Sequence, residues 1–278
     1  MLIVALYKFL NLFLLACIFY TSLYLFLHFY TSCPLGAFLL KFLCMSDFFR
    51  TFAQNLRNND NCTTDIMKNC LRKFVNHWAE CSVYLAGMVA LVAILCPFSI
   101  TVKLLLASIL FLLLHFFEEF AWPGGFAYMG VKVLLGMNEP DQTKWNSNNL
   151  NAMYGNWGFL LLIYVLPLCL PNVKVLLLAA MMFNFAELLM HLVIFNVRLK
   201  TCYNPGMVTA VFGLTPISIY YFSCVFDASL YAWYHYVLAV IWFILVFWLC
   251  FRSPIFWSLG KKEGYQLTEQ AAFGFFEH

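Results

Sequence analysis

Three ionisable side chains stand close together inside a stretch of the sequence that is otherwise apolar. Residues 115–119 read His-Phe-Phe-Glu-Glu, so His115, Glu118 and Glu119 occupy positions i, i+3 and i+4. On an α-helix this spacing puts the three side chains on one face. Ionisable groups at membrane depth are costly, and those that occur there mark functional sites. The pattern therefore predicts a site that uses imidazole and carboxylate chemistry.

A second polar set follows in another apolar stretch. Asn184, Glu187 and His191 stand at i, i+3 and i+7, which is again one helical face. His115 lies seven residues before Trp122, and His191 lies seven residues before Arg198, and each of these residues follows the end of its apolar stretch. With a rise of 1.5 Å per residue, both histidines lie about 10 Å from one membrane interface if the two helices run parallel. The two sets are therefore expected to meet at one level inside a helical bundle.

Two imidazoles and three carboxylates together form a ligand set for a divalent metal ion. The predicted ligands are His115, Glu118, Glu119, Glu187 and His191. Imidazole combined with carboxylate suits zinc, or an iron or manganese centre. Di-metal centres in helical bundles use these ligand types with a Glu-x-x-His spacing. Here the spacings are His-x-x-Glu-Glu and Glu-x-x-x-His, so the agreement lies in ligand type and not in motif.

Further roles follow from the chemistry that such a centre would need. Glu119 is predicted to act as a general base, because a carboxylate in the site can accept a proton from the reacting group. Asn184, Tyr203 and Asn204 are predicted to orient the ligands or to contact the substrate. Zinc would favour hydrolysis and iron would favour oxidation, and the residues leave both reactions open. The predicted function is a membrane-embedded metal-dependent enzyme that acts on a lipid or another hydrophobic substrate.

The same residues allow two other functions. A proton-coupled transporter or carrier would relay protons along the glutamates and histidines. A membrane scaffold without catalytic activity would use them as a hydrogen-bond network that holds helices together. Carriers favour broken helices near the midplane of the bilayer. In this sequence the breaks lie at the ends of the apolar stretches and the polar set lies off-centre, so the carrier ranks below the enzyme.

The composition is that of a polytopic membrane protein. The chain has 278 residues, of which 64% are hydrophobic and 10% are charged, whereas about 25% of the residues of a soluble domain are charged. Its net charge of +3 is not gathered into a basic stripe, so nucleic acid is not an expected partner. The sequence has no nucleotide-cofactor motif. The expected partners are membrane lipids and a hydrophobic small molecule.

Seven apolar stretches are long enough to cross a membrane as helices. The first covers residues 2–30, and aromatic residues recur at helical spacing in the polar region 31–76, as in a helix on the membrane surface. We therefore predict an all-α bundle of about seven transmembrane helices. Residues 1–75 would form an N-terminal helix with an interfacial segment, and residues 76–278 a six-helix core. The six core spans are predicted at roughly 78–96, 101–121, 155–171, 173–197, 206–226 and 229–251.

The loops between these stretches differ in charge. If seven spans alternate, one side receives most of the basic residues, and the other receives Lys103, Lys174 and, near the N-terminus, Lys8. Cytoplasmic loops carry an excess of lysine and arginine. The sequence therefore predicts an N-terminus outside, a C-terminus in the cytoplasm, and a polar site near the cytoplasmic side. The basic residues on that side are Arg50, Arg57, Lys68, Arg72, Lys73, Lys132, Lys144, Arg198, Lys200, Arg252, Lys261 and Lys262.

The pattern His-Phe-Phe-Glu-Glu at 115–119, followed by Pro-Gly-Gly-Phe at 123–126, resembles the HXXEE-domain family of membrane proteins. The later Glu-x-x-x-His and the Tyr-Asn-Pro-Gly at 203–206 are also similar to that family's pattern. The resemblance covers roughly residues 76–278, and residues 1–75 look like an addition to it. It implies a membrane location and no particular reaction, so the function has to be argued from the site itself.

Overall fold

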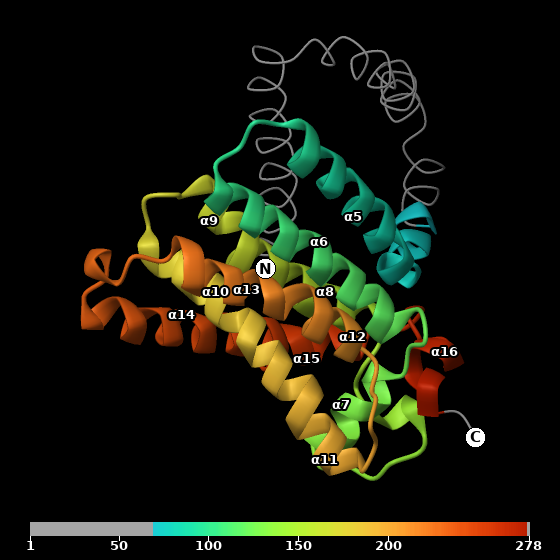
Figure 1. The fold of residues 1–278 in the computed structure, drawn as a ribbon. Helices are drawn as coiled ribbons and strands as arrows, with labels where there is room; N and C mark the ends of the chain where they lie inside the picture. The colour runs from blue at the N-terminus through green and yellow to red at the C-terminus, as the bar shows by residue number, and fades with distance from the viewer. Residues whose placement is uncertain (1–68, 277–278) are drawn as a thin grey trace, which may run out of the picture. The chain divides into compact units, whose positions relative to one another are not determined.

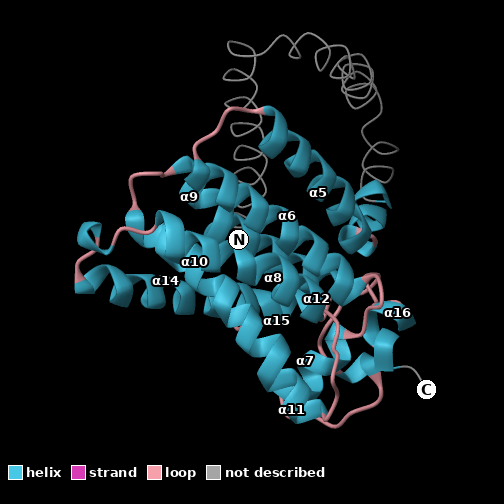
Figure 2. Ribbon diagram, viewed as in Figure 1, coloured by secondary structure: helices cyan, strands magenta, loops and turns pink. Residues whose placement is uncertain are grey.

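The structure is a computed structural model, and it describes residues 69–276 of the chain. Within these residues the chain forms helices joined by turns and loops, without a strand (Figure 1 and Figure 2). Six helical segments are long and apolar enough to cross a membrane. The chain is therefore an all-α, multi-pass membrane protein, as its composition predicts. The first predicted span, 2–30, lies outside the described residues, as does most of the predicted surface segment.

The six spans differ in how regular their helices are. The first two are single helices, α5 (Trp78–Leu95) and α6 (Ile100–Phe120). Most of the later spans contain π-helical turns, labelled η2 to η5, and the last is α14 followed by α15. Their segments are α8 (Asn149–Leu160), η2 (Leu161–Val165), α9 (Leu166–Cys169), α10 (Lys174–Leu188), η3 (Leu189–Phe195), α11 (Asn196–Leu199), α12 (Met207–Thr209), η4 (Ala210–Leu214), α13 (Thr215–Tyr220), η5 (Tyr221–Val225), α14 (Trp233–Phe251) and α15 (Pro254–Gly260).

The six core spans predicted from hydropathy are confirmed, with two clear shifts of a boundary. The last span continues through α15 to Gly260, beyond the predicted end at residue 251. The third span begins at Asn149 and not at residue 155. Asn148 caps the helix, since its side chain accepts hydrogen bonds from the backbone N–H groups of Leu150 and Asn151, both at 3.0 Å. Asn151 completes the capping box by accepting from the backbone of Asn148 at 2.8 Å. The asparagines that precede the predicted start at residue 155 therefore cap and begin the helix.

Helix α6 lies at the centre of the helices that hold the candidate site. It packs along α5, and the buried Trp78 of α5 lies with its ring centroid 5.6 Å from that of Phe116 and 5.0 Å from that of Phe120. Helix α10 packs against α13 and α14, and α8 packs against α15 (Figure 1). The core that results is largely aromatic and aliphatic. Such packing gives α6 and α10 fixed positions from which to present polar side chains.

Short helices that hydropathy does not predict lie beyond the spans. Helix α7 (Phe126–Leu134) follows the Pro-Gly-Gly turn, and the C-terminal segment packs onto that turn. The backbone N–H of Phe275 donates to the carbonyl of Gly124 at 3.2 Å. A Cβ on Gly124 would lie less than 3.0 Å from the Gln270 carbonyl oxygen, so only glycine permits this approach. The remaining short segments are η1 (Gln142–Lys144), η6 (Ala228–Leu230), α16 (Glu269–Ala272) and η7 (Gly274–Phe276).

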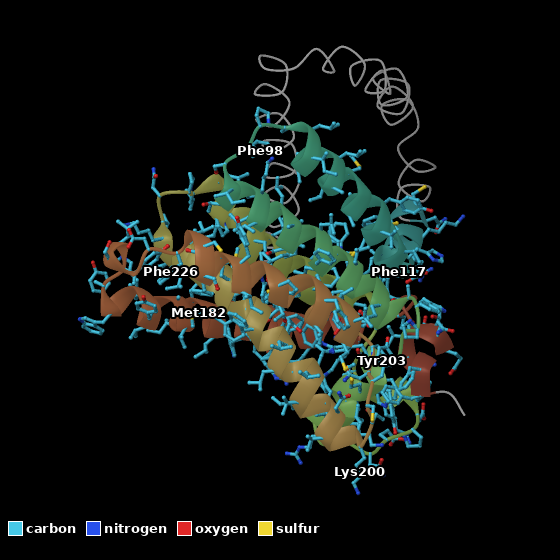
Figure 3. The ribbon with its side chains drawn as sticks, viewed as in Figure 1. Phe98, Phe117, Met182, Lys200, Tyr203 and Phe226 are labelled. Atoms are coloured by element: carbon cyan, nitrogen blue, oxygen red, sulfur yellow. The ribbon has the colours of Figure 1, made fainter. Side chains whose placement is uncertain are left out.

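The ends of the spans separate the two sides of this core. Figure 3 shows Lys200 and Tyr203 at one end of the helices, and Phe98 and Phe226 toward the other. Helix α7, the C-terminal segment and the loop from α11 to α12 lie together at the end with Lys200 (Figure 1). This is the end toward which α6 and α10 both run, and it lies closest to the predicted polar site.

Candidate metal centre

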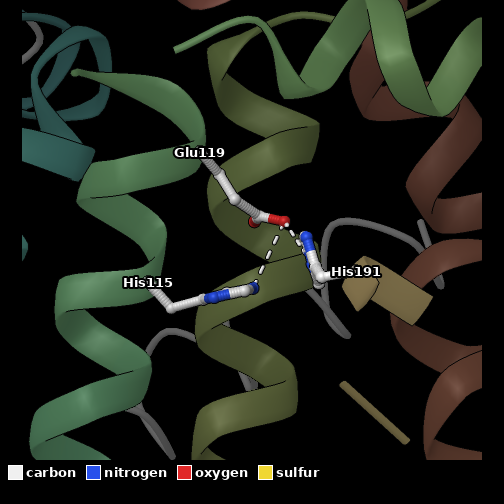
Figure 4. Close-up of side chains that lie close together, drawn as sticks. All are labelled: His115, Glu119 and His191. Carbon is white, nitrogen blue, oxygen red and sulfur yellow. Dashed lines mark ion pairs between the residues drawn. The ribbon is translucent and has the colours of Figure 1, made fainter. Parts of the chain in front are cut away.

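A buried group of two histidines and one glutamate lies between α6 and the span that contains α10 and η3. His115 and Glu119 are one turn apart on α6, and His191 comes from η3. The three residues are 2%, 3% and 1% exposed. Figure 4 shows the Glu119 carboxylate facing both imidazoles, and one ligand atom from each residue lies within 4.8 Å of the others. Such a group could hold a metal ion.

Glu187, one turn before His191, adds a second carboxylate. Its Oε2 lies 3.3 Å from Nε2 of His191 and 3.6 Å from Nε2 of His115. Oε1 of Glu119 lies 3.3 Å from Nε2 of His115 and 3.5 Å from Nε2 of His191. Each imidazole therefore faces both carboxylates through Nε2. We refer to His115, Glu119, Glu187 and His191 as the His/Glu cluster.

Two of the four nitrogen–oxygen distances in the His/Glu cluster, both 3.3 Å, fall in the range of ligands around one cation, and the other two, 3.5 and 3.6 Å, are slightly longer. Ligands bound at about 2.1 Å and separated by octahedral or tetrahedral angles lie about 3.0–3.4 Å apart. The four nitrogen–oxygen distances are 3.3–3.6 Å. A direct hydrogen bond between imidazolium and carboxylate is shorter, about 2.7–2.9 Å. The donor atoms themselves, two imidazole nitrogens and carboxylate oxygens, suit zinc, iron or manganese.

Asn204 fixes the orientation of the His191 ring. Its Nδ2 donates to the carbonyl of His191 and to Oδ1 of Asn196, both at 2.7 Å. Both amide hydrogens are then used, so Oδ1 of Asn204 accepts from Nδ1 of His191 at 2.7 Å. A neutral His191 with its proton on Nδ1 presents the lone pair of Nε2 to the cluster. This is how outer hydrogen bonds prepare a histidine to bind a metal.

Thr209 fixes the orientation of the His115 ring, as Asn204 does for His191. The Thr209 hydroxyl lies 2.6 Å from Oε2 of Glu118 and 2.8 Å from Nδ1 of His115. A carboxylate only accepts, so the hydroxyl donates to Glu118 and accepts from Nδ1–H of His115. Nε2 of His115 is then free to act as a ligand. The two histidines thus reach the cluster with the same nitrogen, each held by a residue from the segment 204–209.

Glu118 stands beside Glu119 in the sequence but uses its carboxylate differently. Its Oε1 accepts from the Tyr203 hydroxyl and from the backbone N–H of Val208, both at 3.0 Å. Its Oε2 accepts from the backbone N–H of Thr209 at 2.9 Å as well as from the Thr209 hydroxyl. Four hydrogen bonds therefore tie Glu118 to the segment between α11 and η4. The sequence predicts Glu118 as a ligand, whereas these contacts assign it the anchoring of the residues that orient His115.

Gly206 lets the backbone pass directly beside both imidazoles. Its φ is +98°, in the left-handed region that favours glycine. A Cβ at this position would lie less than 3.0 Å from Cε1 of His191 and from Cε1 of His115. The two rings are themselves in contact, with centroids 4.8 Å apart and planes at 87°. Any larger residue at position 206 would displace the two imidazoles.

Tyr203 and Asn184, which the sequence predicts to orient the ligands or to contact the substrate, have different surroundings. Burial, together with the charge and hydrogen bond of Glu118, raises the pKa of the Tyr203 hydroxyl above its usual value. Tyr203 is therefore a neutral donor to Glu118. Asn184 instead donates to Oγ of Ser108 at 3.2 Å and accepts from the Tyr164 hydroxyl. It joins three spans, and its described hydrogen bonds do not go to the imidazoles.

An apolar cavity of about 450 Å³ borders the His/Glu cluster, and all four cluster residues line it. Most of its other walls are aromatic and aliphatic side chains from α6, α7, α10 and α14. Ligand sites commonly have this construction, with a few convergent polar groups in an otherwise apolar pocket. The polar lining residues outside the cluster are Ser147, Asn156 and Arg252. A hydrophobic molecule that entered the cavity would meet the His/Glu cluster.

The spacing of residues in the sequence predicts the four residues of the His/Glu cluster. It does not predict two residues that contact the cluster histidines, Thr209 and Gly206. The meeting of His115 and Glu119 with Glu187 and His191 follows from their shared depth in two parallel helices. Thr209 and Gly206 are absent from the prediction, although Gly206 completes the Asn-Pro-Gly run that stands out in the sequence. A glycine directly after such a turn is the signal that could have identified it. Thr209 carries no comparable signal, because its role depends on where α12 lies.

Comparison with known proteins agrees with the resemblance of the sequence. A family model described as a protein of unknown function with HXXEE motif matches residues 105–221. The match contains the whole His/Glu cluster and the segment 203–209. Searches of the curated proteins and of the solved structures found no match. Residues 105–221 accordingly match the HXXEE family model, and the function of that family is unknown.

Proposed function

We propose that this protein is a membrane-embedded, metal-dependent enzyme that acts on a lipid or another hydrophobic substrate. The observation that carries the proposal is the position of the His/Glu cluster on the wall of an apolar cavity of about 450 Å³. Ionisable groups that only hold helices together need no adjoining space. Ionisable groups that act on a substrate need one, and an apolar cavity selects an apolar substrate.

The residues divide into ligands and groups that position them. His115, His191, Glu119 and Glu187 would hold the ion. When bound, the ion would supply Lewis-acid chemistry, polarising a substrate group or activating water or oxygen. Glu119 would also serve as general base, through a carboxylate that already lies in the cavity wall. Glu118 is a positioning residue, because its hydrogen bonds hold the segment that orients His115.

The reaction class depends on which metal is bound. Zinc would support hydrolysis, while iron or manganese would support oxidation. The cluster offers two nitrogen and two carboxylate ligands, a set that these metals share. Metal identity therefore decides between a hydrolase and an oxidoreductase.

We also propose that the His/Glu cluster lies near the cytoplasmic side of the membrane. The loops at its end of the helices carry Lys132, Lys144, Arg198 and Lys200. The opposite loops, between α5 and α6, between α9 and α10 and between η5 and α14, are poor in basic residues. This asymmetry supports a cytoplasmic C-terminus and, with a first span at 2–30, an N-terminus outside.

A proton-coupled carrier remains the second candidate function, because buried glutamates and histidines can also relay protons. It requires His115 or His191 to take up a proton on Nε2. An apolar cavity of about 450 Å³ beside these residues suits a hydrophobic substrate, and a proton relay does not need one. The enzyme is therefore preferred.

Elemental analysis of the purified full chain tests the proposal. Wild type prepared without chelator would be measured beside a His115→Ala, His191→Ala double variant. A His77→Ala variant is the matched control, because the His77 side chain is exposed and its described ion pair is with Glu80. All samples should give the same size-exclusion profile.

The proposal expects about one equivalent of zinc, iron or manganese in wild type and in His77→Ala, because one set of ligands is present. It expects loss of that metal from the double variant. Wild type without metal would sink the proposal and favour the carrier or the scaffold. Metal retained by the double variant would place it elsewhere in the chain.

A further inference from the structure

The cavity has a cationic residue in its wall as well as the His/Glu cluster. Arg252, at the end of α14, is the one lysine or arginine among the described residues that line it. Its guanidinium donates to the Phe251 carbonyl at 3.3 Å and lies 5.8 Å from the centre of the Phe247 ring. In the described part of the chain no carboxylate lies within ion-pair distance of it. A partly buried guanidinium without an anion is an available binding group.

An apolar path runs along α14 toward this arginine. Phe243, Phe247 and Phe251 stand at i, i+4 and i+8, so they share one face of the helix, and all three line the cavity. They extend over about 12 Å of helix. The lining also includes Phe116 of α6, next to the cluster residue His115. The cavity thus joins a long apolar lining to one cation.

We infer that the cavity binds a single-chain amphiphile, with its carboxylate head group at Arg252 and its hydrocarbon chain along the phenylalanines of α14. A guanidinium binds a carboxylate through two parallel hydrogen bonds. A phosphate head group, with a charge near −2, would call for more than one cation, and Arg252 stands alone in the wall. The inference rests on the proposed function and names its substrate class.

Size and access agree with this occupant. The volume of about 450 Å³ lies in the lower half of the usual range for small-molecule sites, roughly 300–1,000 Å³, which favours one chain over two. Leu189 lines the cavity and is also 53% exposed on the surface of its span. An amphiphile dissolved in the bilayer could therefore enter from the side.

Tryptophan fluorescence provides the test, because Trp145 and Trp257 line the cavity. The full chain in detergent would be titrated with a fatty acid brominated on its chain, since bromine quenches tryptophan on contact. A brominated fatty alcohol of equal length reports binding without the charge, and a brominated alkyl phosphate tests the other anionic head group. The variants are Arg252→Gln and Arg252→Lys, with exposed Arg198→Gln as the matched control.

The acid is expected to bind wild type and Arg198→Gln about 10–100-fold more tightly than the alcohol, the range for a hydrogen-bonded charge pair. Arg252→Gln should remove that preference, and Arg252→Lys should keep part of it. Retention of part of the preference by Arg252→Lys would also show that the protein remains folded. Equal binding of acid and alcohol to wild type would overturn the inference, as would tighter binding of the phosphate.

The His115→Ala, His191→Ala double variant separates this inference from the proposed function. It should keep the preference for the acid, because Arg252 is intact. If the double variant lost the preference and Arg252→Gln kept it, the head group would lie at the His/Glu cluster and the inference would be wrong. The metal content of wild type, measured separately, would still stand as support for the enzyme.

Discussion

Asn204 makes two hydrogen bonds to His191, one to the imidazole and one to the backbone carbonyl, both at 2.7 Å. The ring is thereby held by the loop between α11 and α12, although it belongs to the η3 segment of the preceding span. The position of the His191 imidazole in the cluster therefore depends on this loop. Metal binding should therefore depend on loop residues that do not touch the metal.

Asn204→Asp tests this dependence. A carboxylate cannot donate to the His191 carbonyl or to Asn196, and it offers an acceptor that stabilises a protonated ring. We expect the affinity for zinc to fall about 10–100-fold, as for other groups that orient metal ligands. Competition with a coloured chelator would measure it. Asn172→Asp, in an exposed loop, is the control, and an unchanged affinity in Asn204→Asp would contradict the assigned role.

Gly206→Ala should abolish metal binding while the helices stay folded. The new methyl group would lie less than 3.0 Å from ring carbons of both His115 and His191, so the imidazoles must separate. Alanine at a φ of +98° adds about 1–3 kcal/mol of backbone strain. Circular dichroism and elemental analysis of the same sample would check both expectations. Gly87→Ala is the control, because nothing lies within 4 Å of its added methyl group.

Glu118→Gln should mainly lower the stability of the fold, whereas Glu119→Gln should mainly lower the metal content. Glu118 accepts four hydrogen bonds, and an amide nitrogen in place of one oxygen would face donors, which costs about 1–3 kcal/mol of stability. Glu119→Gln should instead lower metal content, with a smaller change in the midpoint of thermal unfolding. Both quantities would be measured on both variants. If Glu118→Gln lost metal without losing stability, Glu118 would be a ligand after all.

Tyr203→Phe should make stability less sensitive to alkaline pH. The pKa of Tyr203 is raised in the folded chain, first by burial and then by Glu118. The stability that its neutral hydroxyl contributes is therefore fully present below the unfolded pKa of about 10, and it is lost as the pH rises beyond that. The unfolding midpoint of wild type should fall more steeply above pH 10 than that of the variant. Exposed Tyr84→Phe should behave as wild type, and parallel curves for Tyr203→Phe and wild type would refute the prediction.

Hydropathy was sufficient to predict the six described spans, because a segment that crosses a membrane must satisfy its backbone internally and cover about 30 Å with apolar residues. Hydropathy did not predict every end of these spans correctly. Hydropathy starts the third span at residue 155, yet the side chains of Asn148 and Asn151 form a capping box that starts α8 at Asn149. Helix α7 is nine residues long, too short for a spanning pattern, and the C-terminal segment depends on contacts with the Pro-Gly-Gly turn.

By itself the sequence determined that His115, Glu119, Glu187 and His191 would share one depth, because helical rise and the cost of buried charge leave few alternatives. It could not distinguish Glu118 from Glu119, which are neighbours on the same helix. Only the tertiary structure decided that one carboxylate anchors a loop while the other faces two imidazoles.

Contacts between distant segments also decided the roles of Thr209, Gly206 and Arg252. Thr209 lies 94 residues from His115 in the sequence and 2.8 Å from it in space. Gly206 is needed because two rings from different helices lie against it. Arg252 belongs to the cavity because α14 packs against α8 and α10. Local patterns fix which groups each helix can offer, whereas the packing of helices against one another fixes which groups meet.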